Sequence, residues 1–122
     1  MELKSYFEST DGTGVLSTAD SNGNVDAAIY SRPHFLEDKV AFIMRDRLTH
    51  KNLESNPHAV YLFIENGPGY KGKRIYLTKV KEEKNSERIA SLKRRQKDSN
   101  PDEDKFLVFF EFNSERPLVG DN

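Results

Sequence analysis

Residues 40–63 constrain the fold of this chain most tightly, because they combine a strand, a short helix and a second strand in one stretch. Pro57 divides this stretch, since a proline cannot continue a helix and disfavours helical geometry at the residue before it. A helix that begins near Thr49 must therefore end by Asn56. The apolar segments before and after the helix are then two strands, so we expect a strand–helix–strand unit.

The two strands of this unit differ in their hydrophobic patterns. The first strand, 39–45, has the two-residue period of a β-strand, with Val40, Phe42 and Met44 on one face. The second strand, 59–64, is apolar on both faces, and this pattern predicts burial on both sides.

The start of the predicted helix carries a set of hydrogen-bond donors: Thr49, His50, Lys51 and Asn52. The first turn of a helix has unpaired backbone N–H groups and the positive end of the helix dipole. A hydroxyl, an imidazole and an ammonium group add further donors there. The residue chemistry therefore predicts a site for a phosphate group.

The order of motifs in this region resembles the flavin-binding core of the pyridoxamine 5′-phosphate oxidase-like split-barrel family. That core has an aromatic strand, a Ser/Thr-Arg-Lys-type triplet, a Leu-x-x-Asn-Pro segment and an apolar strand. The corresponding residues here are 42–45, Thr49-His50-Lys51, Leu53, Asn56-Pro57 and 60–63. The resemblance covers residues 14–81 well and the remainder of the chain in outline.

The resemblance implies a mainly β fold, a six-stranded antiparallel Greek-key split barrel with short helices, as a single domain over residues 1–122. It also implies a homodimer with FMN in the groove between subunits, acting as a small flavin-dependent oxidoreductase or an electron carrier. Thr49, His50 and Lys51 would hold the FMN phosphate, and Met44 and Arg45 would lie along the isoalloxazine ring. The other candidates for flavin contacts are Tyr30, Ser31, Arg32 and Asn52.

The remaining elements follow from local patterns. Asn22-Gly23 is typical of a tight hairpin turn. We expect helices at 3–9 and 84–97, strands at 14–19, 25–31, 74–83 and 105–113, and an acidic loop at 98–104.

The last strand, 105–113, is apolar on both faces. We expect Phe106, Val108, Phe110 and Phe112 to line the barrel interior. The opposite residues, Leu107 and Phe109, need another cover, and the 84–97 helix has only a narrow apolar stripe. We therefore expect this outer face, together with Tyr61 or Leu62, to lie at a two-fold interface.

Composition excludes several classes of function. The net charge of −1 argues against general attraction to nucleic acids or membranes. The absence of cysteine rules out disulfides and thiolate chemistry, and no spacing of histidines or carboxylates is typical of a zinc site. We find neither a signal-peptide core nor an apolar run long enough for a membrane helix, so we expect a cytoplasmic protein.

Other ligands and roles stay open. Pyridoxamine phosphate oxidases carry a tryptophan-containing substrate motif, and this chain has no tryptophan, so we do not expect that reaction. Relatives also use deazaflavin or haem, and His34, His50 and His58 permit a haem hypothesis. A split-barrel binding module without flavin is the non-enzymatic alternative. The substrate or redox partner is not specified by the sequence.

Overall fold

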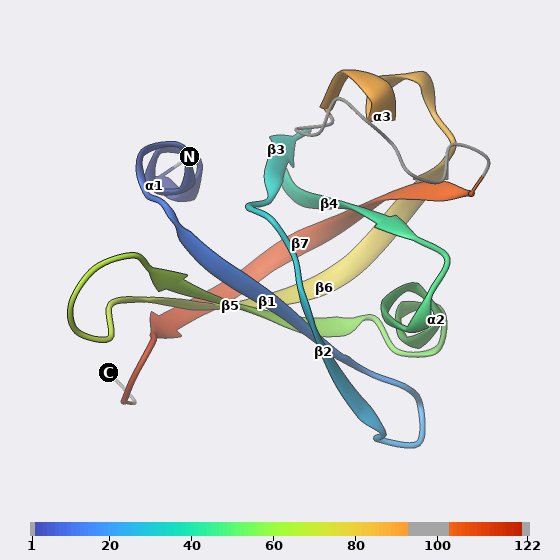
Figure 1. The fold of residues 1–122 in the computed structure, drawn as a ribbon. Coiled ribbons are helices and arrows are strands. Elements are labelled where there is room, and N and C mark those ends of the chain that lie inside the picture. Colours follow the sequence, from blue (N-terminus) through green and yellow to red (C-terminus); the bar gives the residue numbers. More distant parts are fainter. Residues whose placement is uncertain (1, 93–102, 121–122) are drawn as a thin grey trace.

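One seven-stranded antiparallel sheet dominates the computed structural model, which describes residues 2–92 and 103–120 (Figure 1). In chain order the elements are α1 (Glu2–Ser9), β1 (Gly12–Ala19), β2 (Val25–Ile29), β3 (His34–Leu36), β4 (Lys39–Arg45), α2 (Leu48–Ser55), β5 (His58–Glu65), β6 (Gly72–Lys84), α3 (Glu87–Leu92) and β7 (Lys105–Pro117). No helix within these ranges is long and apolar enough to cross a lipid bilayer.

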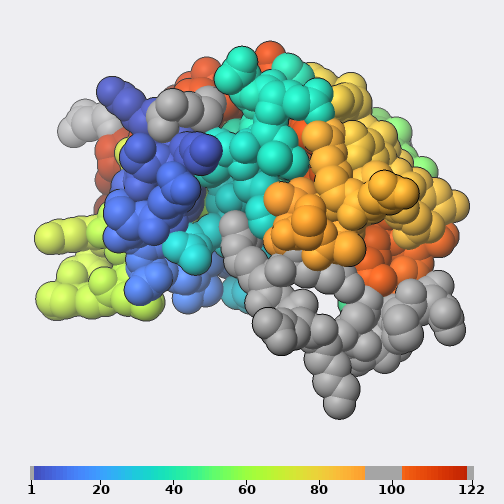
Figure 2. All heavy atoms as spheres, turned by 90° about the horizontal axis from the view of Figure 1, so that it is seen from above, coloured from blue at the N-terminus to red at the C-terminus, as the bar shows by residue number. Residues whose placement is uncertain are grey.

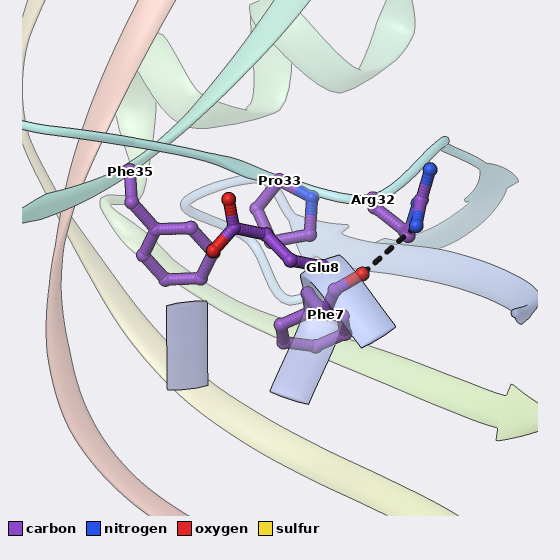
Figure 3. A pocket seen from close by; sticks show the side chains of 5 residues that line it. All are labelled: Phe7, Glu8, Arg32, Pro33 and Phe35. Carbon is purple, nitrogen blue, oxygen red and sulfur yellow. Dashed lines mark hydrogen bonds between the residues drawn. The ribbon is translucent and has the colours of Figure 1, made fainter. Parts of the chain in front are cut away.

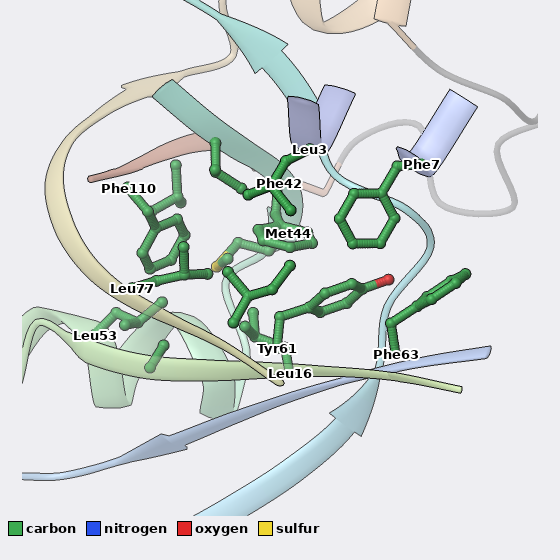
Figure 4. Packing of buried hydrophobic residues seen from close by; sticks show 14 of the residues in the cluster. Leu3, Phe7, Leu16, Phe42, Met44, Leu53, Tyr61, Phe63, Leu77 and Phe110 are labelled. Carbon is green, nitrogen blue, oxygen red and sulfur yellow. The ribbon is translucent and has the colours of Figure 1, made fainter. Parts of the chain in front are cut away.

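The strand order of the sheet is β2-β1-β5-β6-β7-β4-β3, so several neighbours are distant in the sequence. β1 pairs with β5, and β4 pairs with β7. The sheet curls so that strands from both of its halves line one core (Figures 1 and 4). This arrangement confirms the predicted mainly β split barrel with short helices.

The prediction of six strands is wrong by one, because β3 was not expected. β3 is only three residues long and joins β4 through Glu37 and Asp38, with Leu36 opposite Lys39. Both turn residues have positive φ angles, 54° and 60°. That geometry fits a two-residue hairpin turn, for which Asn-Gly or Asp-Gly is the usual signal. Glu-Asp lacks this signal, so the sequence pattern did not predict a hairpin.

The main core lies between the curled halves of the sheet. Val40, Phe42 and Met44 of β4, which the alternation placed on one face, all point into it. β7 contributes its predicted inner face: Phe106, Val108, Phe110 and the partly buried Phe112. Helices close the core at opposite ends, α1 through Leu3 and Phe7 and α2 through Leu53 (Figures 1 and 4).

A smaller second core covers the outer face of β7. Leu107 and Phe109 are fully buried there with Ala41 and with Ile89 of α3. In Figure 2, α3 (orange) lies against the teal β3–β4 region. The prediction that Phe109 lies at a two-fold interface is therefore wrong, because a single chain already covers it. Tyr61 is also fully buried, in the main core.

The predicted 84–97 helix also needs correction at its start. β6 continues to Lys84, Asn85 has a positive φ of 51°, and α3 begins only at Glu87. β6 is long because it pairs with β7 as far as Lys84 opposite Phe106. The C-terminal part of the predicted helix and most of the acidic loop, residues 93–102, lie outside the described residues.

The outer face of β2, β1 and β5 has no such cover from the residues that the structure describes. β5 buries Ala59, Tyr61 and Phe63 but leaves alternate residues partly or fully exposed, so the described residues of one chain do not bury it on both sides as predicted. We call this surface the open sheet face, and it comprises Val15, Val25, Ile29, Leu62 and Ile64. Val15 lies opposite both Ile29 and Leu62 in the strand register. Ile29 is 71% exposed and Val25 is 82% exposed.

Candidate functional site

The first turn of α2 is the best candidate for an anion site. Its N-cap residue is Arg47, with φ −125° and ψ −165°, and Arg47 makes no side-chain capping hydrogen bond. An arginine has no acceptor to offer to the N–H groups of the first turn. These groups and the helix dipole together favour a negative charge at this end of α2.

The β1–β2 hairpin fixes the position of α2. The side-chain amide of Asn52 donates to Oγ1 of Thr18 over 3.1 Å, and Asn56 Nδ2 donates to the carbonyl oxygen of Asp20 over 3.4 Å. Leu53 adds an apolar contact with the main core. Because Asn52 is buried and its amide is bound to β1, its role is to hold the helix rather than to contact a ligand.

Tyr30 lies beside the start of α2, directly after β2. Its backbone N–H donates to Gly14, and its carbonyl oxygen accepts the hydroxyl of Tyr61 over 3.1 Å. Gly14 is required there, because a methyl group at this position would overlap the Tyr61 phenol. Burial raises the pKa of the Tyr30 phenol, and a hydrogen bond with the Thr49 side chain acts in the opposite direction. The structure thus brings together Tyr30 and Thr49, two of the predicted site residues.

Three cationic side chains surround this end of α2. Arg45 contacts Glu103 over 3.3 Å, and Arg47 makes two hydrogen bonds of 3.1 Å to the same carboxylate. Lys51 is exposed in the first turn of the helix and adds a third positive charge. A negatively charged ligand at this turn would therefore lie near Lys51 and compete with Glu103 for Arg45 and Arg47.

His50 does not point toward this cationic group. It is 2% exposed and stacks on Phe106, with 3.9 Å between ring centroids. Its Nδ1 lies 2.8 Å from Asp46 and its Nε2 lies 3.0 Å from Glu82. Two carboxylates at the ring would repel a phosphate, so we leave His50 out of the proposed phosphate site.

The Met44 side chain is also unsuitable for the predicted contact with the flavin ring. It is 2% exposed within the main core, so its side chain cannot lie along a ring bound at the surface. The sequence pattern placed Met44 on the same face as Phe42, and the structure shows that this face is the core. Residue 45 points the other way, which leaves Arg45 as the candidate from this strand.

Arg32 and Ser31 lie on the exit from β2. Ser31 is exposed, whereas Arg32 Nη1 donates to the carbonyl oxygen of Phe7 over 2.9 Å. Figure 3 shows Arg32 at an open pocket of about 250 Å³ beside α1. The pocket is lined by Phe7, Glu8, Arg32, Pro33 and Phe35. The hydrogen bond to Phe7 directs the Arg32 side chain toward α1. We therefore do not include Arg32 in the cationic group at α2.

Arg47 was missed as a candidate. The sequence placed the helix start at Thr49, whereas the structure starts α2 at Leu48 and makes Arg47 its N-cap. The available signal was a basic residue directly before a predicted helix start, where a capping Ser, Thr, Asp or Asn is usual.

Comparison with known proteins gives a likeness in structure alone. No protein-family model matches the sequence, and no curated protein matches it. An FMN-binding protein from Syntrophomonas wolfei subsp. wolfei has a TM-score of 0.69 and 20% identity, covering 97% of this chain and 84% of that chain. The haem storage protein HutZ from Vibrio cholerae has a TM-score of 0.64 and 18% identity, covering 95% and 92%. An F420 reductase has a TM-score of 0.68 and 10% identity, covering 86% and 89%.

These identities are low, so the likeness establishes the arrangement of strands and helices and leaves the ligand open. It agrees with the strand order and the curled sheet described above. The chain therefore has the split-barrel fold of the pyridoxamine 5′-phosphate oxidase-like proteins.

Proposed function

We propose that this protein binds FMN as a homodimer and works as a small flavin-dependent oxidoreductase or electron carrier. The observation that carries the proposal is the first turn of α2, which lacks a side-chain cap and is flanked by Arg47 and Lys51. A dianionic phosphate monoester complements that turn better than a neutral ligand does. When bound, the isoalloxazine ring of FMN would supply the redox chemistry.

The chain's own residues would act on the phosphate in distinct ways. The N–H groups of residues 48–50 and the Lys51 ammonium would donate hydrogen bonds to its oxygens. Arg47 would exchange part of its pairing with Glu103 for the phosphate, which carries more negative charge. Thr49 is buried against Tyr30, so we assign both to shaping the wall beside the phosphate. Ser31, exposed at the exit from β2, remains a candidate for contact with the ring.

The open sheet face is our proposed dimer interface, in place of the outer face of β7. Val25, Ile29 and Ile64 of this face are exposed among the described residues, and Val25 and Ile29 belong to the edge strand β2. A second copy packed on it would remove this apolar surface from water. α2 packs against the β1–β2 hairpin, so a phosphate at α2 would lie next to this interface. A ring extending from it would enter the groove between subunits.

Haem is the second candidate ligand, since one of the similar structures is a haem storage protein. Of the three histidines, His50 has both ring nitrogens against carboxylates. The residues that would hold a haem iron are therefore His34 or the exposed His58. A deazaflavin resembles FMN in shape and would use the same groove, as the likeness to an F420 reductase suggests. A flavin-free binding module is the non-enzymatic alternative.

The test of the phosphate site is Lys51→Ala, measured by titrating the apoprotein with FMN and with riboflavin. We expect FMN affinity to fall by about 1–3 kcal/mol, the range for losing a charge-assisted hydrogen bond. Riboflavin has no phosphate and its affinity should change little. Lys4→Ala, an exposed lysine on α1, is the matched control. Equal losses for the two ligands would remove Lys51 from the phosphate role.

The test of ring placement is Arg45→Gln, with Arg32→Gln as the comparison. A positive charge near the ring favours its reduced form, which is more negatively charged, so loss of Arg45 should lower the reduction potential of bound flavin. Arg32 lies at the α1 pocket and should have the smaller effect. An unchanged potential in Arg45→Gln with FMN still bound would contradict the assignment.

A further inference from the structure

A cluster of side chains with metal-ligating atoms lies along α2 and the residues that lead into it. Asp46, His50 and Glu54 are spaced four residues apart, so they follow one face of the helix and its entry. One ligand atom from each of them lies within 4.8 Å of the other two. Asp46 and Glu54 are exposed, whereas the imidazole between them is buried.

The imidazole in this cluster is held in a fixed orientation. His50 stacks on Phe106, and its Nε2 lies 3.0 Å from Glu82 of β6. Glu82 is itself bound by Lys79 over 2.7 Å. Glu82 accepts from Nε2 and fixes the ring orientation, while Nδ1 faces the Asp46 carboxylate over 2.8 Å and would become a metal ligand on giving up its proton. Metal-binding histidines usually have this arrangement.

We propose that Asp46, His50 and Glu54 bind a divalent first-row transition metal ion, with Zn²⁺ as the reference ion. The ligands would be His50 Nδ1 and one carboxylate oxygen from each acid. Nδ1 and the Asp46 oxygen are 2.8 Å apart, and the same two atoms would be roughly 3.3 Å apart across a tetrahedral zinc ion with bonds of about 2.0 Å. A small increase in the distance between these two atoms would thus let the ion replace the proton between them.

The donor set also indicates the class of metal. Imidazole nitrogen suits zinc, copper, iron and nickel, whereas calcium and magnesium prefer oxygen donors throughout. The two carboxylates supply the negative charge that a dication needs, and Lys79 balances Glu82. Glu54 is exposed, so its side chain is free to move toward the ion at little cost in packing.

The sequence alone predicted no metal site, for two reasons. The spacing Asp-x₃-His-x₃-Glu matches no common zinc motif, and Asp46 precedes the helix that carries the other two residues. Glu82, the residue that orients His50, is distant in the sequence and reaches the imidazole from β6. Only the folded chain brings these groups together.

The test is calorimetric titration of the untagged protein with Zn²⁺, with thermal unfolding as a second readout. We expect binding near one equivalent and a rise in Tm that saturates with zinc. Glu54→Gln should weaken zinc binding at least about 10-fold, and Glu82→Gln should weaken it by about 10–100-fold, the usual effect of losing a partner that orients a ligand. The matched control is Asp38→Asn, an exposed turn acid with positive φ.

Several outcomes separate this site from surface binding and from the FMN proposal. Zinc affinity that is unchanged in both Glu54→Gln and Glu82→Gln, or that falls equally in Asp38→Asn, would overturn the proposal, as would no binding at micromolar zinc. Lys51→Ala should retain zinc binding, so the metal site stands or fails independently of the FMN site. His50→Gln should abolish binding. Because that variant can also unfold, the two glutamate variants decide the outcome.

Discussion

The two outer faces of the sheet carry similar apolar side chains but are covered differently. On β7, Phe109 is fully buried beneath α3, and Lys81 and Arg88 lie 4.4 Å and 5.0 Å from its ring centroid. On β2, Ile29 is 71% exposed, so the described part of the chain leaves it largely uncovered. An outward apolar residue therefore indicates a need for cover, while the rest of the fold decides whether the cover comes from the same chain.

The largest effect on stability should come from a substitution on the outer face of β7, which α3 covers and which we call the covered face. Phe109→Ala should destabilise the protein by about 3–5 kcal/mol, the usual cost of removing a buried aromatic ring. The cause is the lost packing and the cavity left beneath α3. Chemical denaturation measures the change, and Phe109→Leu should lose less because it fills more of that space. A loss below about 1 kcal/mol for the alanine variant would contradict burial within one chain.

A substitution on the open sheet face should change self-association rather than the stability of the single chain. Ile29→Glu should weaken self-association by at least about 2 kcal/mol, or roughly 30-fold in Kd, because a charge would be buried at the proposed interface. Light scattering measures the shift to monomer, and flavin absorbance should fall with it, since the proposed groove needs both subunits.

A matched control for Ile29→Glu is Val119→Glu, which places the same charge on a valine that is 65% exposed outside the open sheet face. Val119→Glu should leave the oligomeric state unchanged. A folded Ile29→Glu variant that remains a dimer with bound flavin would assign the interface to another surface.

The smallest effect should come from the ion pairs that support α3. The Lys81 and Arg88 side chains hydrogen-bond to Glu37 and lower the pKa of its carboxyl group from 4.5 to about 2. A lowered pKa contributes stability that is complete above pH 4.5 and is lost as the pH falls toward 2. Because Glu37 is exposed, we expect a modest change.

Glu37→Gln tests this contribution. Its stability deficit relative to the original protein should be present at about pH 6 and should shrink as the pH falls toward about 2. Thermal melts across this range measure the deficit. A deficit that stays constant with pH would show that the charge of Glu37 does not support the covered face.

The local hydrophobic period predicted much of the fold. The alternation in β4 placed Phe42 and Met44 on one face, and that in β7 assigned Phe110 to the core and Phe109 to the outer side, because a strand's period fixes which residues share a face. The period could not predict what covers each face. α3 has few apolar residues, yet Ile89 suffices because Lys81 and Arg88 extend over the remaining surface of Phe109.

The candidate site was predictable only in part. The chain pattern located the start of α2 to within one residue, because caps and prolines act locally, and Lys51 there remains a proposed phosphate contact. It assigned His50 to the phosphate site, because nothing in the local sequence indicates Glu82, which reaches the imidazole from β6. It also offered Asn52 as a ligand contact, although its amide binds Thr18 of β1. Side chains that bind distant strands are those that local reasoning assigns wrongly.

The most direct test of the proposed function is the visible absorption spectrum of the purified, untagged protein, followed by mass analysis of the released ligand. If the protein binds FMN as proposed, it will be a yellow dimer with flavin bands and near-equimolar FMN. A colourless protein that binds no FMN at micromolar concentration would contradict the proposed function, and a haem spectrum with no flavin would replace the assigned cofactor.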